Sequence, residues 1–141
     1  MKIIKISHSE QETFETAFNI GKNAVKGTII TLSGDLGAGK TVMAKGIGAS
    51  LGVDEDITSP SFSLFEMYEG KLPFYHFDLY RIESKDELEN LHFDEYWYGK
   101  GISVIEWPEI AKEELDGPVI SIKIESLNNE TRRITIEYPD N

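Results

Sequence analysis

The chain has 141 residues, which suits one domain with its own hydrophobic core, and 28% of them are charged. The formal net charge of −11 disfavours a free-standing nucleic-acid binder, because neutralising phosphates requires clustered Lys and Arg; it leaves room for a protein partner with a basic face. The sequence contains no cysteine, which excludes disulfides and thiolate chemistry, and no apolar run approaches the roughly 18 residues that span a bilayer. We therefore expect a cytoplasmic protein without a membrane partner.

The first predicted elements are a short strand and an amphipathic helix. Residues 3–6 combine isoleucines with a lysine and predict an edge strand. Ser9 and Glu12 have the spacing of a capping box, in which each side chain bonds a free backbone N–H of the other, so a helix should begin here. We expect it to carry its apolar face as far as Val25 and to end near Gly27.

A phosphate-binding loop follows this helix. Residues 28–32 are a β-branched run that predicts a buried strand, and residues 34–41, GDLGAGKT, satisfy G-x-x-x-x-G-K-[ST] at every fixed position. Apolar residues at helical spacing then predict a helix to about Leu51. In such loops backbone N–H groups surround a phosphate, the lysine reaches the β- and γ-phosphates and the hydroxyl binds Mg²⁺. The alternative, a simple Gly-rich turn, requires neither Lys40 nor Thr41.

A hydroxyl-rich loop and a hairpin come next. Residues 58–63, Thr-Ser-Pro-Ser-Phe-Ser, are expected to be extended, and two interpretations stay open: the loop orders around a γ-phosphate and Mg²⁺, or it bonds to its own backbone. Residues 62–68 and 72–80 predict two strands of a hairpin. The second strand ends near Asp78, where phosphate-loop enzymes hold Mg²⁺ directly or through water. We interpret His76 as a packed or surface histidine rather than a catalyst.

The next elements are a short helix, an aromatic cluster and a central strand. A second capping box at residues 84–87 predicts a helix that ends near Leu91. Core packing is favoured over an interface for the four aromatic residues that follow, which are Phe93, Tyr96, Trp97 and Tyr98. Residues 101–105 predict a central strand that ends at Glu106.

Glu106 has two interpretations. Because ligands of parallel α/β sheets bind at the carboxyl ends of the strands, Asp78 and Glu106 should both approach Thr41. Alternatively, Glu106 is a carboxylate that favours the N-terminus of a helix, predicted to begin at Pro108 and to reach about Leu115.

The last predicted elements are strands over residues 119–125 and 132–138, joined as an antiparallel hairpin at a sheet edge. Arg132 and Arg133 should point to opposite faces of the second strand. Together the elements predict an α/β fold of the P-loop NTPase type, with a mostly parallel sheet, flanking helices and antiparallel edge strands that include the C-terminal hairpin. Residues 1–141 should form a single P-loop ATPase domain.

Four segments go beyond a generic phosphate loop: residues 34–41, SPSF at 59–62, YHFDLYR at 75–81 and IEWPE at 105–109. In this order the chain resembles the bacterial TsaE family (also called YjeE or YdiB), the ATPases of tRNA threonylcarbamoyladenosine biosynthesis. The resemblance runs from about residue 9 to residue 138. Ser61 stands where the family usually carries Thr, and the hydroxyl is kept.

The resemblance implies an ATPase that uses ATP and Mg²⁺ and acts with partner proteins of the TsaD and TsaB type. That complex modifies adenosine 37 of tRNAs reading ANN codons, and ATP hydrolysis by this subunit supports its turnover, with tRNA contacted only indirectly. The implied catalytic residues are Lys40, Asp78 and Glu106, and the implied Mg²⁺ ligands are Thr41 and Glu106. The implied ATP-binding residues are Thr13, Asp35, Leu36, Gly37, Ala38, Gly39, Lys40, Thr41 and Arg133.

Rival functions remain at this stage. The sequence has no Asn-Lys-x-Asp pattern for reading guanine, which favours ATP over GTP. A stand-alone small-molecule kinase would need basic residues to hold an acceptor, and the only arginines of the chain are Arg81, Arg132 and Arg133. A nucleotide-gated binding module is the non-enzymatic alternative. The scarcity of arginines also predicts slow hydrolysis without partner proteins.

Overall fold

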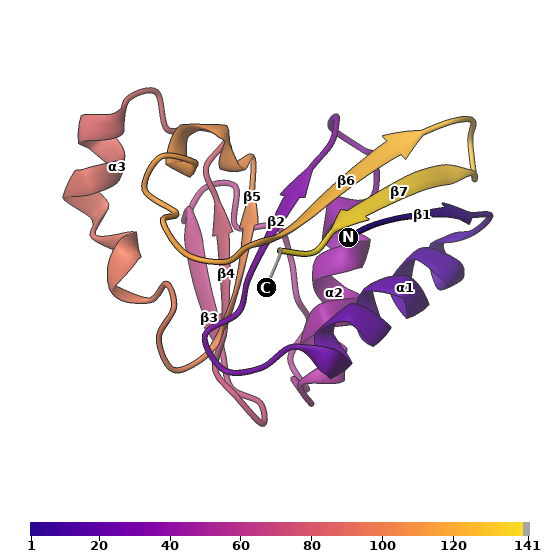
Figure 1. Ribbon diagram of the computed structural model, residues 1–141, viewed down its shortest axis with the longest axis horizontal. Helices are drawn as coiled ribbons and strands as arrows, with labels where there is room; N and C mark the ends of the chain where they lie inside the picture. The colour runs from indigo at the N-terminus through magenta and orange to yellow at the C-terminus, as the bar shows by residue number, and fades with distance from the viewer. Residues whose placement is uncertain (140–141) are drawn as a thin grey trace.

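The structure is a computed structural model that describes residues 1–139. Its seven strands form one sheet in the order β1-β7-β6-β2-β5-β4-β3, shown in Figure 1. The strands are β1 (Lys2–Ser7), β2 (Ile29–Ser33), β3 (Phe65–Tyr68), β4 (Phe74–Asp78), β5 (Ile102–Glu106), β6 (Ile120–Ser126) and β7 (Arg132–Glu137).

The centre of the sheet is parallel and its edges are antiparallel, as predicted. Strand β2 pairs in parallel with β5 and β6, and β4 pairs in parallel with β5. The hairpin of β6 and β7 is antiparallel, but β1 pairs on the outer side of β7, so the edge belongs to β1. At the other edge β3 pairs with β4 as the predicted hairpin.

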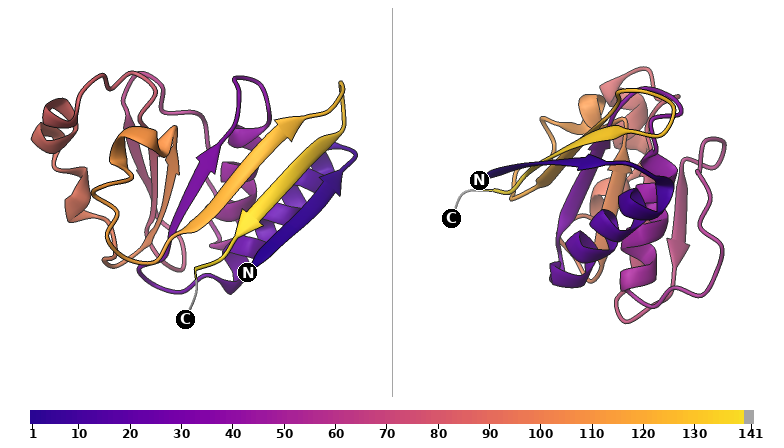
Figure 2. Two further views of the ribbon diagram at one scale, coloured as in Figure 1. Left: turned by 45° about the horizontal axis from the view of Figure 1, so that its top comes forward. Right: turned by 90° about the vertical axis from the view of Figure 1, so that its right-hand side faces the viewer.

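Two layers of helices cover the two faces (Figures 1 and 2). The α-helices α1 (Glu10–Asn23) and α2 (Lys40–Ser50) lie together on one face. The other face, over β3, β4 and β5, is covered by α3 (Lys85–Leu91) and the 3-10 turns η1 (Phe93–Glu95) and η2 (Pro108–Ala111). Ser9 and Ser84 cap α1 and α3 as predicted, each accepting from a backbone N–H at 3.1 Å.

Each face of the sheet has its own core. On the α1 and α2 face the core is mainly aliphatic, because the strands present branched side chains such as Ile30, Leu32 and Ile122. On the other face aliphatic side chains surround a cluster of aromatic rings, in which Phe77 stacks on Phe65 at 4.8 Å between ring centroids and meets Phe93 and Trp97. This confirms core packing for Phe93 and Trp97.

The structure corrects four element boundaries. Strand β4 spans Phe74–Asp78 rather than residues 72–80. The chain after Pro108 forms only the four-residue η2, which follows the left-handed Trp107 (φ 55°), and the backbone hydrogen bonds from Lys112 to Glu109 and from Glu114 to Ala111 have 3-10 spacing. Strand β3 begins at Phe65 rather than Phe62, since Leu64 has φ 69° and interrupts the extended backbone. Helix α1 ends before residue 24, so Val25 lies outside it and is 70% exposed.

Candidate functional site

The loop between β2 and α2 is shaped by glycines with positive φ. Gly34, Gly37 and Gly39 have φ values of 153°, 79° and 117°, which L side chains rarely adopt. A Cβ on Gly34 would lie 2.4 Å from the carbonyl oxygen of Ile124, so the close approach of the loop to β6 also requires a glycine. Helix α2 begins at Lys40, which directs its free N–H groups and positive dipole end toward the loop.

Lys40 is held by the loop itself. Its Nζ donates hydrogen bonds to the carbonyl oxygens of Gly34 at 2.6 Å and Asp35 at 2.8 Å, and it lies 4.4 Å from the ring centroid of Trp107. Burial lowers the pKa of Lys40, and the nearby carboxylates, chiefly Glu106, oppose that shift. A partly desolvated ammonium beside an anion-binding loop is suited to a phosphate, which would compensate its charge better than carbonyl oxygens do.

Asp78 and Glu106 meet at the carboxyl ends of β4 and β5. They are direct register partners, both only 3% exposed. A pocket of about 220 Å³, here the carboxylate pocket, joins them to the phosphate loop. Its lining is Leu36, Gly37, Gly39, Lys40, Thr41, Val42, Ser59, Ser61, Asp78, Tyr80, Glu106 and Trp107. Asp78, Glu106 and Thr41 thus line one pocket, as expected from the sequence.

The hydroxyl-rich loop is tied to Asp78. The hydroxyls of Ser59 and Ser61 donate to Oδ2 of Asp78 over 3.3 and 3.4 Å, and the backbone N–H of Tyr80 donates to Oδ1 at 3.0 Å. The hydroxyls of Ser59 and Ser61 therefore bond to a carboxylate of the pocket and to each other. Because the two hydrogen bonds from the serine hydroxyls are long and therefore weak, the hydroxyls can change partner when a ligand binds.

His76 holds the other carboxylate. Its Nε2 lies 2.5 Å from Oε2 of Glu106, and the histidine is fully buried. The burial of His76 agrees with the predicted packed histidine, but its contact with Glu106 was not predicted from the sequence. Its position two residues before Asp78 places both side chains on one face of β4, but the contact with Glu106 depends on the register of β4 against β5.

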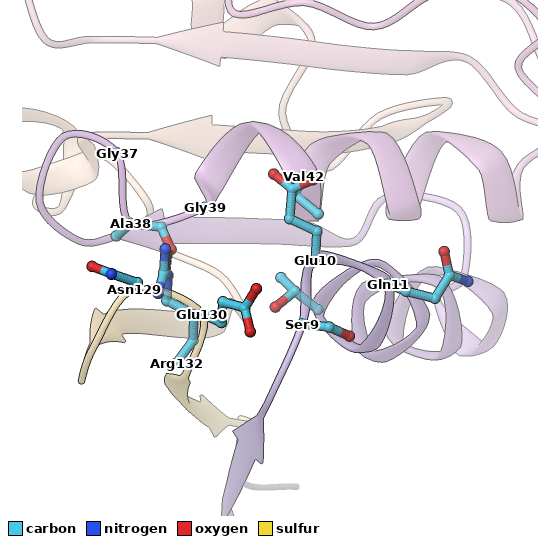
Figure 3. A pocket seen from close by; sticks show the side chains of 11 residues that line it. Ser9, Glu10, Gln11, Gly37, Ala38, Gly39, Val42, Asn129, Glu130 and Arg132 are labelled. Carbon is cyan, nitrogen blue, oxygen red and sulfur yellow. Dashed lines mark hydrogen bonds between the residues drawn. The ribbon is translucent and has the colours of Figure 1, made fainter.

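A second and wider pocket of about 520 Å³ lies on the other side of the loop, between the start of α1 and the β6–β7 turn (Figure 3). We call it the turn pocket. It is lined by Ser9, Glu10, Gln11, Thr13, Gly37, Ala38, Gly39, Val42, Asn129, Glu130 and Arg132. Thr13, expected from the family resemblance, lies here and shares a 2.7 Å hydrogen bond with the hydroxyl of Ser7.

Arg132, rather than the predicted Arg133, belongs to the turn pocket. Figure 3 shows its side chain rising toward Ala38, whose carbonyl oxygen accepts from Nε at 2.8 Å. The same guanidinium donates to the carbonyl oxygen of Asn128 at 2.8 Å. Arg133 points to the opposite face, where Nη1 lies 3.8 Å from Oε1 of Glu125. Strand alternation separates the two side chains without telling which of them faces the loop, and the family resemblance pointed to Arg133.

The donor set of the carboxylate pocket fits Mg²⁺ bound together with a nucleotide. Within residues 1–139, no group of three or more His, Cys, Asp or Glu side chains is placed to hold a metal ion by protein ligands alone. Mg²⁺ usually takes one or two carboxylates plus phosphate and water oxygens, and the pocket offers Glu106 with the hydroxyl of Thr41. Among residues 1–139, none of the helices has the length and apolar character that a membrane span requires.

Comparison with known proteins gives a consistent result. The sequence model of the family "Threonylcarbamoyl adenosine biosynthesis protein TsaE" matches residues 7–134. The tRNA threonylcarbamoyladenosine biosynthesis protein TsaE of Treponema pallidum is 37% identical over 93% of this chain and 97% of its own length. The protein of the same name from Bacillus subtilis is 42% identical over 79% of this chain and 70% of its own length. The crystal structure of Bacillus subtilis YdiB superposes with a TM-score of 0.83 at 32% identity, covering 100% of this chain and 88% of that one.

Proposed function

The chain belongs to the TsaE family, and we propose that it is the ATPase subunit required for threonylcarbamoyladenosine modification of adenosine 37 in tRNAs reading ANN codons. Residues 1–141 would act in the cytoplasm as a single P-loop ATPase domain that binds and hydrolyses ATP·Mg²⁺. The observation that carries the proposal is the convergence of Lys40, Asp78 and Glu106 on one pocket beside the phosphate loop. A stand-alone kinase is not favoured, because the relatives carry the name of a tRNA-modification protein.

In this proposal the loop residues 35–41 bind the phosphates through their backbone N–H groups. Lys40 exchanges the carbonyl oxygens of Gly34 and Asp35 for the β- and γ-phosphate oxygens, where its charge stabilises the transition state. Thr41 and Glu106 would hold Mg²⁺, which when bound neutralises charge on the β- and γ-phosphates.

Asp78 is suited to orient the attacking water. The backbone N–H of Tyr80 fixes one carboxylate oxygen, and among residues 1–139 only the two long bonds from Ser59 and Ser61 engage the other. When the hydroxyls turn to the γ-phosphate, Oδ2 is released to accept a hydrogen bond from water. The hydroxyl-rich loop would in this way couple the nucleotide state to the shape of the surface around Phe62, which is 84% exposed.

The turn pocket would receive the nucleoside. It lies across the phosphate loop from the carboxylates and is large enough for a base and a ribose. We propose that Thr13 and Arg132 contact the nucleotide there, with Arg132 taking the place that the sequence analysis gave to Arg133.

Partner proteins would complete the catalytic site. Among the described residues that line the carboxylate pocket, Lys40 is the only basic one. Phosphoryl transfer gains about 10³–10⁵ in rate from an additional arginine, so the isolated chain should hydrolyse ATP slowly. We propose that proteins of the TsaD and TsaB type dock beside this pocket, through a basic surface that complements the net charge of −11, and that tRNA is contacted only indirectly.

Hydrolysis and docking assays with these partners test the proposal. ATP hydrolysis is measured for the purified chain alone and with TsaD- and TsaB-type proteins, and pull-downs are made with ATP, ADP or no nucleotide at low and high salt. We expect slow basal hydrolysis, acceleration by the partners, and nucleotide-dependent docking that weakens as salt rises. Docking indifferent to nucleotide, with hydrolysis unchanged by the partners, would contradict the proposal, and a phosphorylated small-molecule product would favour the kinase.

A further inference from the structure

Within residues 1–139, the side chains of His76 and Glu106 form a hydrogen bond or ion pair only with each other. Nε2 and Oε2 are 2.5 Å apart, and the exposed fractions of the two residues are 0% and 3%. The partners come from neighbouring strands, β4 and β5, whose register fixes their separation. A carboxylate binds Mg²⁺ in its ionised form, which only accepts hydrogen bonds, so in that form the hydrogen of this contact lies on Nε2.

The second ring nitrogen of His76 argues against a role in packing alone. Nδ1 is buried and has no hydrogen-bond partner among the described residues. Leaving a buried polar atom unmatched destabilises a fold, and the ring of His76 is packed against Phe74 at 6.1 Å between ring centroids. An apolar side chain at this position would avoid that cost. The feature that only the histidine provides is the hydrogen bond to Glu106.

From this geometry we propose that His76 is a positioning residue that holds the Glu106 carboxylate in the orientation needed to bind the Mg²⁺·nucleotide. The inference rests on the proposed function for the role of Glu106 and adds a residue to it. With Oε2 engaged by His76, the carboxylate cannot rotate away from the pocket that it lines together with Thr41. Carboxylates that bind metals are commonly oriented in this way by a hydrogen-bond donor behind them.

The test measures Mg²⁺ dependence rather than activity alone. ADP binding to the full chain is measured by calorimetry in EDTA and over a series of Mg²⁺ concentrations, for the unmodified protein, His76→Leu, His76→Gln and Glu106→Gln. We expect His76→Leu to raise the Mg²⁺ concentration at half-effect about tenfold or more, while ADP affinity in EDTA changes less than twofold. His76→Gln retains a donor of similar reach and should restore most of the Mg²⁺ dependence.

Two further variants separate positioning from general loss of stability. Ile102→Val removes a buried methyl group from β5 without touching Glu106, and its Mg²⁺ dependence should equal that of the unmodified protein. The double variant His76→Leu/Glu106→Gln should show no larger Mg²⁺ defect than Glu106→Gln alone, because both changes act through one carboxylate. If His76→Leu does not fold, His76→Asn replaces it, since that amide is too short to reach Glu106.

The outcomes distinguish the inference from its premise. If the unmodified protein binds ADP without any Mg²⁺ dependence, the proposed role of Glu106 fails and this inference fails with it. If the unmodified protein depends on Mg²⁺ and folded His76→Leu or His76→Asn keeps the same dependence, only the inference is overturned. Equal Mg²⁺ defects in His76→Gln and His76→Leu would also overturn it, because they would show that the hydrogen-bond donor is irrelevant.

Discussion

The two pockets beside the phosphate loop are built in opposite ways. In the carboxylate pocket, Asp78 and Glu106 are buried, come from paired strands and are held by hydrogen bonds before any ligand is bound. The charged residues of the turn pocket are not buried: Glu10 of α1 and Glu130 of the β6–β7 turn are exposed, and Arg132, which links that turn to the loop, is half-buried. A fixed arrangement of charges suits transition-state stabilisation, and an adaptable one suits binding. Substitutions in the first pocket should therefore reduce turnover, alone at Asp78 and together with Mg²⁺-dependent affinity at Glu106, and those in the second should reduce affinity and leave turnover largely unchanged.

The largest effect is expected for Lys40→Ala. The change removes the cation that faces the phosphates and should lower ATP hydrolysis at least about a hundredfold, because charge stabilisation accounts for most of the acceleration in phosphoryl transfer. Hydrolysis is measured with the partner proteins present, and thermal unfolding verifies the fold. The matched control is Lys45→Ala on the same helix, whose Nζ pairs with Asp56 at 3.1 Å and should be dispensable. Normal hydrolysis by folded Lys40→Ala would refute the phosphate-loop assignment.

The two carboxylates should differ in the step that they support. Asp78→Asn should keep nucleotide affinity and reduce turnover by about a hundredfold, since it removes the group that orients water. Glu106→Gln should weaken Mg²⁺-dependent nucleotide binding and hydrolysis together. Titrating Mg²⁺ against ATP affinity in both variants measures this difference. The reverse pattern would exchange the two roles, and unchanged turnover in both would remove them from the mechanism.

The carboxylate pocket was predictable from the sequence because its key residues end strands of a parallel sheet. Apolar runs before Asp78 and Glu106 indicate buried parallel strands, and such strands bring their carboxyl ends to one edge. The link from His76 to Glu106 was not predictable, because it depends on the register of β4 against β5 and not on spacing within either strand.

The turn pocket was the less predictable half of the site. Alternation along β7 separates Arg132 from Arg133, but which of them faces the phosphate loop depends on how the hairpin is placed against β2. The left-handed conformation of Trp107 likewise could not be predicted from the residue type, since non-glycine residues rarely adopt it unless tertiary contacts favour it. Here those contacts are the ammonium of Lys40 and the ring of Tyr80, at 4.4 and 4.7 Å from the indole centroid.

A smaller effect, and one on affinity, is expected for Arg132→Ala. Losing the bond from Nε to the carbonyl oxygen of Ala38 detaches the phosphate loop from the β6–β7 turn and removes a positive charge from the turn pocket. We expect ADP to bind about tenfold more weakly, the effect of one charge-assisted hydrogen bond, with turnover at saturating ATP reduced much less. Arg133→Ala is the matched control and should bind ADP within twofold of the unmodified protein. Equal losses in both variants would show that net charge matters and the position of the arginine does not.

The smallest effect should come from the two helix caps, which offer a matched pair. Ser9 and Ser84 each accept a backbone N–H at 3.1 Å, so Ser9→Ala and Ser84→Ala should each lower the free energy of unfolding by about 1 kcal/mol. Ser9 also lines the turn pocket, whereas the lining of neither pocket beside the phosphate loop includes Ser84. Chemical denaturation measures the stabilities, and calorimetry with ADP measures the affinities.

Because loosening the first turn of α1 disturbs the turn pocket alone, Ser9→Ala should weaken ADP binding two- to threefold and leave Mg²⁺ dependence unchanged. Ser84→Ala should lose stability only; if it weakened ADP binding equally, affinity would follow global stability and the division between the two pockets would fail.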